Sequence, residues 1–538
     1  MKGIKYEISY EKPHRHIVDF KAQFPVLGRS EIELSLSLWR PGRYEAANYA
    51  SKILSISFSH QGRSLSANKS RVNSWKIESE GLEYIEVSYS FYADHFDAGG
   101  CWLDDEQLYL NPVNCILFDV ENQELGYEID LDLPEGFKVA SQLGYGEIRS
   151  LQSPSFDELA EAPFICSQSL THRTFEASGV LIHIWIQGEF LFDLDKFVED
   201  HRLFTEEQIK DFGFFPSEDY HFLYHIPHVR AYHGVEHSRS TVISMGPSAK
   251  SGETKFYHDL IGIASHELYH TWNVKQLRPK VLTPYNYREP RTSALGFIYE
   301  GVTTYLGDKY LWTTKVYDDE EYAHELALKV LRHLHNPGRL SLSLADSSID
   351  TWVDGYILGT PWRKVSIYNE GALVSMIIDA KIHALSGGDL GIEHWMKMLM
   401  RRCPLAKGGY EQDDLEATLL EVCGWDSVEF FRNYVYGTGD LIALVKNSLL
   451  ELGWKLSLGE NPKLHECKFG FKMDKKSLVV GIYPGSAAEE LGLWLGDLVE
   501  NVDENELIYV RKSNGERKVM HLPLGSKKCY PISKIVRD

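Results

Sequence analysis

Two histidines four positions apart, with a glutamate directly after the first, form the most chemically suggestive pattern in the sequence. The pattern reads HELYH and runs from His266 to His270. Residues four apart lie on one face of a helix, so the two imidazoles can bind a single zinc ion. Glu267 lies on an adjacent face, where it can act as a general base toward a water that the metal activates. Because zinc lowers the pKa of water, the pattern predicts metal-dependent hydrolysis.

The residues around this pattern favour a metal site over a solvent-exposed helix that happens to carry two histidines. The neighbouring positions are apolar and comprise Leu260, Ile261, Ile263, Ala264 and Leu268. A helix of this composition is expected to be mostly buried, and buried imidazoles need hydrogen-bond or metal partners. The five-residue pattern alone is short enough to arise by chance, so the interpretation depends on this context.

A third protein ligand is expected downstream, because catalytic zinc keeps three protein ligands and one open position. The preferred candidate is Glu300, at the start of a second predicted helical run with apolar neighbours. A carboxylate in apolar surroundings is costly unless it binds a cation. Asp308 and Glu289 are the alternatives. The predicted metal ligands, for one zinc per chain, are His266, His270 and Glu300.

The periodicity of the sequence divides the chain into three regions, which we expect to be separate domains. Residues 1–172 alternate polar and apolar positions between turns, which predicts an antiparallel β-sandwich. Residues 173–450 contain strands followed by helices, which predicts an α+β domain that carries the zinc residues. Residues 451–538 return to short strands and glycine turns, which predicts a smaller module.

Individual elements follow from the same patterns. Strands are expected where polar and apolar residues alternate or apolar residues cluster: 31–39, 82–91, 180–186, 222–226 and 241–245. Helices are expected where apolar residues recur every three or four positions before a glycine or proline: 320–334, 371–385 and 414–423.

The composition excludes several classes of protein. The 538 residues include 77 acidic and 56 basic side chains, a net charge of −21, which argues against nucleic-acid binding. No apolar stretch is long enough to cross a membrane, and the N-terminal residues lack the apolar run of a signal peptide. The seven cysteines are widely spread, with no C-x-x-C pair, which favours a reducing compartment. We therefore expect a cytoplasmic protein with no nucleic-acid or membrane partner.

A longer string around the histidines resembles a known family. The letters HELYHTWNVKQLRP, from His266 to Pro279, are similar to the zinc helix of the glycyl aminopeptidase family, which continues as HxWNxKxxRP. Members of that family have an N-terminal β domain, a thermolysin-like catalytic domain and a C-terminal PDZ domain, in the order of the three regions here. The resemblance implies a zinc aminopeptidase that acts on peptides with a free N-terminus and prefers small first residues such as glycine or alanine.

Two further segments fit this resemblance. YHGVEH, ending at His237, resembles the family's GGLEH strand, which implies that Gly234 and Val235 pair with substrate and that Glu236 binds its α-amine. YNEG resembles the family's YxKG, which implies that Tyr368 donates a hydrogen bond to the oxyanion. Taken singly, each residue could equally be an ordinary strand glutamate or a packing tyrosine.

The sequence departs from the family pattern at two positions, one in each of these segments. His233 stands where the family has its first glycine, and Glu370 stands where it has lysine. Both positions flank residues expected to contact substrate. The family's preference for small N-terminal residues is therefore in question for this chain.

The C-terminal region resembles PDZ domains. The letters KFGF, which include Phe469, Gly470 and Phe471, are similar to the PDZ carboxylate-binding loop, and residues 485–497 resemble the segment around a PDZ helix. The resemblance implies that this module can bind a peptide C-terminus by strand addition. The alternative is a cap that packs on the catalytic domain and binds nothing.

Three functions are compatible with the sequence. The leading hypothesis is a zinc aminopeptidase in which Glu267 and Tyr368 are catalytic. A zinc endopeptidase with the same metal site is the second. The third is an inactive peptidase scaffold that acts as a PDZ binding module, and the intact general base Glu267 argues against it.

Overall fold

The computed structural model describes residues 3–357, 362–523 and 528–538. The chain forms two compact units, Met1–Thr292 with Met400–Tyr410, and Ser293–Leu399 with Glu411–Asp538. The first unit contains the β region and the helix with the two histidines. This division differs from the three predicted domains, so their boundaries after residues 172 and 450 stay predictions.

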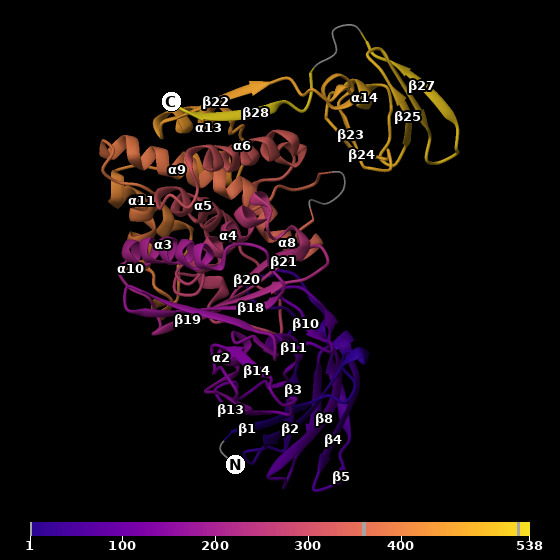
Figure 1. The fold of residues 1–538 in the computed structure, drawn as a ribbon, viewed down its shortest axis with the longest axis vertical. Helices are drawn as coiled ribbons and strands as arrows, with labels where there is room; N and C mark the ends of the chain where they lie inside the picture. The colour runs from indigo at the N-terminus through magenta and orange to yellow at the C-terminus, as the bar shows by residue number, and fades with distance from the viewer. Residues whose placement is uncertain (1–2, 358–361, 524–527) are drawn as a thin grey trace. The chain divides into compact units, whose positions relative to one another are not determined.

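The N-terminal region is built from mostly antiparallel sheets, in agreement with its alternating sequence (Figure 1). The largest sheet has seven strands, in the order β15 (Ser150–Ser153), β13 (Tyr127–Leu131), β1 (Ile4–Ser9), β2 (Ile17–Pro25), β8 (Tyr84–Tyr92), β4 (Ile53–His60) and β5 (Arg63–Ser64). Alternate side chains of β8 are buried, because successive residues of a strand face opposite sides of the sheet. The strand predicted over residues 82–91 is therefore confirmed.

Two smaller sheets complete this region. One has the order β12 (Phe118–Asp119), β3 (Glu31–Ser35), β7 (Ser74–Glu78) and β6 (Ala67–Arg71). The other has the order β14 (Lys138–Ser141), β16 (Phe164–Ser167), β11 (Gln107–Leu110), β10 (Cys101–Leu103) and β9 (Asp94–His95). Two short helices are inserted, α1 (Pro112–Cys115) and α2 (Phe156–Ala160).

The strand predicted over residues 31–39 is shorter than expected and ends at Ser35. Beyond it, Leu38 donates its amide hydrogen to the carbonyl of Tyr287 at 2.7 Å. The residues past the strand stay buried, since Leu36, Ser37 and Trp39 are each 0% exposed. The partner of Leu38 belongs to a loop far along the chain, which alternation cannot reveal.

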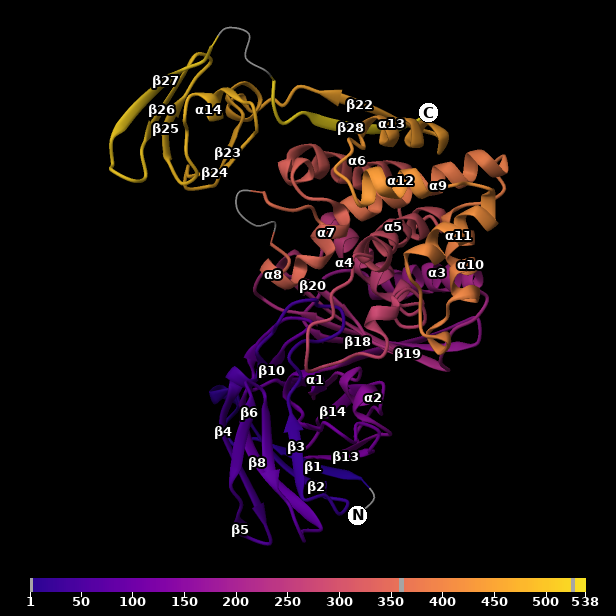
Figure 2. The same ribbon diagram turned by 180° about the vertical axis from the view of Figure 1, so that it is seen from behind.

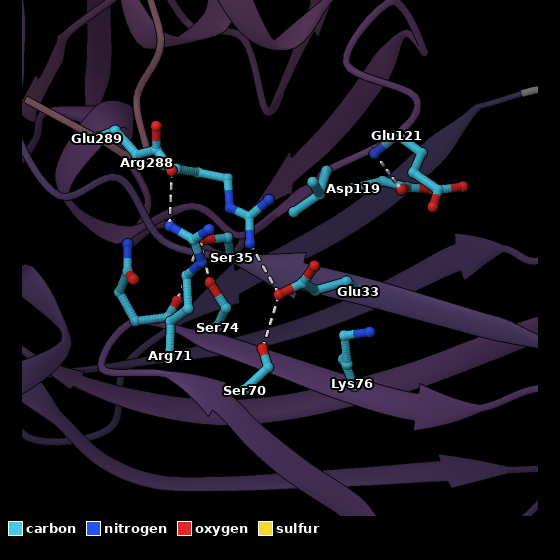
Figure 3. Close-up of polar contacts among 12 residues, drawn as sticks. Glu33, Ser35, Ser70, Arg71, Ser74, Lys76, Asp119, Glu121, Arg288 and Glu289 are labelled. Carbon is cyan, nitrogen blue, oxygen red and sulfur yellow. Dashed lines mark hydrogen bonds and ion pairs between the residues drawn. The ribbon is translucent and has the colours of Figure 1, made fainter. Parts of the chain in front are cut away.

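That loop, residues 277–292, is fixed to the β region by ion pairs (Figure 3). Arg288 Nη2 donates to Glu33 Oε1 at 2.8 Å, and Arg71 Nη1 donates to Glu289 Oε1 at 3.0 Å. The proline-rich segment is therefore irregular but held in place, with one short 3₁₀ turn at Lys280–Leu282.

A five-stranded sheet follows in the first unit. Its order is β17 (Thr171–Ala177), β18 (Val180–Gly188), β19 (Asp219–Ile226), β21 (Ser240–Gly246) and β20 (Ala231–Glu236). The helices of this part are α3 (Leu194–Phe212) and α4 (Thr254–Tyr269). The strands predicted at 180–186, 222–226 and 241–245 are confirmed, and β20 is an additional strand at the end of the sheet.

The sheet and the β region share a hydrophobic core. Trp185, Leu223, Val235 and Val242 of the sheet pack in one buried cluster with residues that precede it in the chain, namely Ala98, Tyr109, Ala140 and Ile165. Burying Val235 there fixes the position of β20, which carries the predicted substrate-binding residues.

The chain from residue 297 to residue 451 is mainly helical. Its larger helices are η5 (Phe297–Val302), α5 (Thr303–Thr313), α6 (Asp319–His335), α7 (Leu344–Ile349), α9 (Asn369–Ser386), α10 (Ile392–Arg402), α11 (Gln412–Cys423), η8 (Phe431–Val435) and α13 (Ile442–Glu451). The predicted helices 320–334, 371–385 and 414–423 correspond to α6, α9 and α11. Gly387 and Gly424 end the last two in the left-handed conformation, as helix-stopping glycines do. In the described parts of the chain, no helix is both long and apolar enough to cross a membrane.

The C-terminal residues form a strand pair and a small β module (Figure 2). The pair consists of β22 (Trp454–Gly459) and β28 (Ile532–Arg537), and Ser533 Oγ donates to the carbonyl of Ala327 in α6 at 2.7 Å. The module contains β23 (Phe471–Met473), β24 (Val479–Ile482), α14 (Ala487–Glu490), β25 (Leu498–Val502), β26 (Glu506–Val510) and β27 (Arg517–His521). Its identity as a PDZ domain stays a prediction.

Candidate active site

The two histidines of the HELYH pattern lie at the end of α4, a helix whose apolar face is buried. His266 belongs to the last turn, and His270 caps the helix with φ −60° and ψ −20°. Their side chains converge, with the two Nε2 atoms 3.1 Å apart. The helix therefore positions both imidazoles toward one point.

The surroundings of His270 fit a metal ligand. Its Nδ1 lies 2.8 Å from the backbone carbonyl oxygen of Asn273. Because a carbonyl oxygen only accepts hydrogen bonds, Nδ1 must carry the hydrogen. The lone pair of Nε2 can then bind a metal on the side of His266. Metal-binding histidines commonly have such a partner on the second ring nitrogen. In a tetrahedral zinc site with zinc–nitrogen bonds of about 2.0–2.1 Å, two ligand nitrogens lie about 3.3 Å apart. The 3.1 Å between the two Nε2 atoms is close to this value.

Two buried carboxylates stand beside these histidines. Glu267 is 6% exposed and Glu236 is 4% exposed. One carboxylate oxygen of each residue and a ring nitrogen of His270 all lie within 4.8 Å of one another. Glu267 comes from α4 and Glu236 from the end of β20. The fold thus brings together the predicted general base and the predicted amine-binding residue.

A glycine allows β20 to approach α4 this closely. A Cβ atom placed on Gly234 would lie 2.3 Å from Oε1 of Glu267 and 2.7 Å from Cγ2 of Ile263. Any side chain at this position would displace the carboxylate of Glu267. The glycine in the YHGVEH segment is therefore explained by packing against Glu267, the predicted general base.

A buried ion pair adjoins Glu236. Lys275 Nζ donates to both carboxylate oxygens of Glu161, at 2.8 and 3.0 Å, and lies 3.9 Å from Glu236 Oε1. Burial raises the pKa of the Glu161 carboxyl above its ordinary value, although Lys275 opposes the change. Burial lowers the pKa of the Lys275 ammonium, but Glu161 contributes to raising it, and the net pKa lies above the ordinary value.

Glu300 and Tyr368 belong to the second unit. Glu300 is 2% exposed and lies in η5, which is a turn of π-helix rather than the expected start of an α-helix. A Cβ on the next residue, Gly301, would lie 2.4 Å from the Cα of Gly371 in α9, so η5 and α9 cross in close contact. Packing of two backbones accounts for the glycine that follows Glu300.

Tyr368 occupies the N-cap position of α9 and is partly exposed. It lines a cavity of about 530 Å³ together with Trp362, His335 and Lys472. The neighbouring Glu370, which replaces the family's lysine, is buried, and its Oε2 lies 2.7 Å from Nδ1 of His333. Tyr368 therefore borders a cavity, and its contact with the oxyanion stays a prediction.

Comparison with known families decides what kind of protein this is. Residues 5–168 match the Peptidase M61 N-terminal domain, and residues 259–374 match the M61 glycyl aminopeptidase domain. The chain belongs to the M61 peptidase family. The resemblance to glycyl aminopeptidases is confirmed, and the second match contains both histidines of the HELYH pattern.

Solved structures show that the fold of this M61 peptidase is shared more widely. An aminopeptidase N family protein from Idiomarina loihiensis is 22% identical, with a TM-score of 0.88 over 99% of this chain and 98% of that protein. An M1 zinc metallopeptidase from Deinococcus radiodurans is 13% identical, with a TM-score of 0.50 over 82% of this chain and 96% of that protein. At these identities the likeness concerns the fold alone. None of the curated proteins matches the sequence.

His233, which replaces a glycine of the family pattern, contacts the β region. Its Nδ1 lies 3.3 Å from Oδ2 of Asp97, and His95 Nε2 contacts the same carboxylate at 2.9 Å. Burial would raise the pKa of Asp97, but hydrogen bonds from the two histidines lower it well below its usual range. In this M61 peptidase the carboxylate of Asp97 therefore contacts β20 at the position where the family pattern has glycine.

The expected carboxylate loop of the C-terminal module is well packed. Phe469 and Phe471 are fully buried in the core of the module, and Gly470 adopts the left-handed conformation with φ +80°. A Cβ on Gly470 would lie 2.3 Å from Cβ of Ser486, which explains the glycine. Carboxylate binding by this loop stays a prediction.

Sequence reasoning missed Glu161 and Lys275. Lys275 is the lysine of the HxWNxKxxRP string that carries the family resemblance. The string singles out this position but indicates no role for the lysine. Glu161 ends the short helix α2 and has no motif around it. Its role depends on a contact with a residue 114 positions away, which a single sequence does not indicate.

The variant Gly234→Ala is expected to lower kcat for peptide hydrolysis by about tenfold or more, because the new methyl group displaces the Glu267 carboxylate from its position. Steady-state kinetics measure the effect. Gly459→Ala is the control, since it lies in a strand and its nearest atom would be at 3.4 Å. Equal kcat in both variants would show that the contact with Glu267 is unimportant.

Proposed function

We propose that this M61 peptidase is a zinc-dependent aminopeptidase that removes small first residues, such as glycine or alanine, from peptides. The observation that carries the proposal is the position of Glu236, buried within 4.8 Å of atoms of Glu267 and His270. A carboxylate there can pair with the α-ammonium of a substrate. It would place the first peptide bond beside the general base, which favours cleavage at the N-terminus.

His266, His270 and Glu300 would hold the metal. The first two converge from α4, and the third is a buried carboxylate in the second unit. Two imidazoles and one carboxylate suit a catalytic zinc site with an open position. Zinc bound by them would act as a Lewis acid that makes water a better nucleophile and stabilises negative charge on the scissile carbonyl.

The side chains of the chain would carry the remaining steps. Glu267 accepts a proton from the attacking water and later donates it to the leaving amine. Tyr368 donates a hydrogen bond to the oxyanion that forms on the scissile carbonyl. Backbone groups of Gly234 and Val235, in the last strand of the five-stranded sheet, extend the sheet to the substrate.

Substrates with and without a free amine separate this proposal from an endopeptidase. Glycyl- and alanyl-4-nitroanilide are expected to be hydrolysed, and their N-acetyl forms to be cleaved at least about a hundredfold more slowly, because Glu236 then has no ammonium to bind. EDTA is expected to remove the activity and zinc to restore it. These rates follow from the absorbance of released nitroaniline.

Three other results of these assays would contradict the proposal. Equal cleavage of acetylated and free substrates would support an endopeptidase instead. Full activity after complete removal of zinc would overturn the metal assignment. Absence of any hydrolysis, together with binding of a peptide C-terminus, would favour a PDZ binding module.

A further inference from the structure

The buried ion pair beside Glu236 has no role in the steps above. The side chains of Lys275 and Glu161 are 3% and 9% exposed, and the ammonium makes both of its short contacts to Glu161. The same ammonium is 3.9 Å from Oε1 of Glu236. That oxygen is buried and accepts no hydrogen bond from the residues that the structure describes.

Other polar groups around the pair are held by their own contacts. Arg278 Nε donates to the carbonyl of Val274 at 2.9 Å, and its guanidinium stacks on the ring of Tyr285 at 3.5 Å. His237 Nδ1 is 3.9 Å from Glu161 Oε2 and is thus too far for a hydrogen bond. Lys275 is therefore a cation placed between two carboxylates, with its hydrogen bonds directed to one of them.

A lysine ammonium on its flexible stem can change partners easily. A shift of about 1 Å would turn the 3.9 Å contact with Glu236 into a charge-assisted hydrogen bond. Glu236 would then be occupied, and a substrate ammonium would have to displace Lys275 before it could bind. The two hydrogen bonds from Lys275 to Glu161 prevent this competition.

We propose that Glu161 is a specificity-determining positioning residue, which holds Lys275 away from Glu236 and so keeps Glu236 available for the α-ammonium of the substrate. This inference rests on the proposed aminopeptidase function. Lys275 in turn offsets the repulsion between two buried carboxylates, which would otherwise be costly. The pair thus sets how strongly the site selects substrates with a free amine.

The assignment gives the N-terminal β region a part in substrate selection. Glu161 directly follows α2 of that region. The same region also approaches Glu236 directly, since a Cβ on Gly42 would lie 2.3 Å from Oε2 of Glu236. The carboxylate of Glu236 therefore lies beside Gly42 of this region and beside Lys275, which Glu161 of this region holds.

The test compares glycyl-4-nitroanilide kinetics in the wild type and in Glu161→Gln. The variant is expected to raise KM by about tenfold or more, the usual effect of one charged hydrogen bond, with kcat changed less than about threefold. The double variant Glu161→Gln/Lys275→Met removes the competing cation and is expected to return KM to within about threefold of the wild type. Glu158→Gln, an exposed position on the same helix, is the matched control.

The double variant separates positioning from a general structural role, because a purely structural loss would not be reversed by a second buried substitution. If Glu161→Gln fails to fold, Glu161→Asp is tested instead. Aspartate keeps the negative charge, but its shorter side chain moves the carboxylate away from Lys275, so KM is again expected to increase. Unchanged KM in the single variant, or a double variant no better than the single, would overturn the inference. A wild type that does not hydrolyse the substrate would instead overturn the proposed function.

Discussion

Glu267→Gln is expected to keep zinc at one ion per chain and to lower kcat for glycyl-4-nitroanilide by at least about a thousandfold, within the range of general acid–base catalysis. Glutamine has nearly the same shape, so packing against Gly234 and the positions of the two histidines should persist. Its amide cannot accept the proton of the attacking water. Zinc is measured by inductively coupled plasma mass spectrometry, and kcat is measured on the same preparation.

Glu253→Gln is the control for this experiment. Glu253 precedes the same helix, α4, and its side chain is 57% exposed and contacts Lys250 at 3.6 Å. Its activity and zinc content should equal those of the wild type. An active Glu267→Gln enzyme would refute the role of general base, and loss of zinc along with activity would show that Glu267 supports the metal residues instead.

Much of the fold follows from local patterns in the sequence. Period-two alternation locates β8, and stop signals at Gly387 and Gly424 end α9 and α11 where expected. These features depend on residues within one turn or one strand, so a single sequence contains them. The HELYH pattern is of this kind, because helix geometry alone brings His266 and His270 together.

Features that depend on distant contacts could not be predicted in this way. Past the end of β3, the amide of Leu38 bonds to the carbonyl of Tyr287, in a loop some 250 residues away. The π-helical turn at Glu300 depends on packing against α9, in which Gly301 meets Gly371. The pairing of Glu161 with Lys275 likewise depends on tertiary structure, and its effect on Glu236 appears only when the three side chains are seen together.

Glu300 is the proposed third zinc ligand. Glu300→Gln is expected to lower zinc content well below one per chain and kcat/KM by at least about a hundredfold, since the metal ion supplies several kcal/mol of stabilisation. An amide oxygen is a weaker zinc ligand than a carboxylate. Zinc content after dialysis and kinetics with glycyl-4-nitroanilide measure both effects, and added zinc should restore part of the activity.

The two alternative ligands serve as controls, because the structure gives each another partner. Glu289 is exposed and pairs with Arg71 at 3.0 Å, so Glu289→Gln should keep both zinc and activity. Asp308 pairs with the buried Lys329, so Asp308→Asn should lower the thermal unfolding temperature but keep zinc. If either control loses zinc while Glu300→Gln retains it, the third ligand is misassigned.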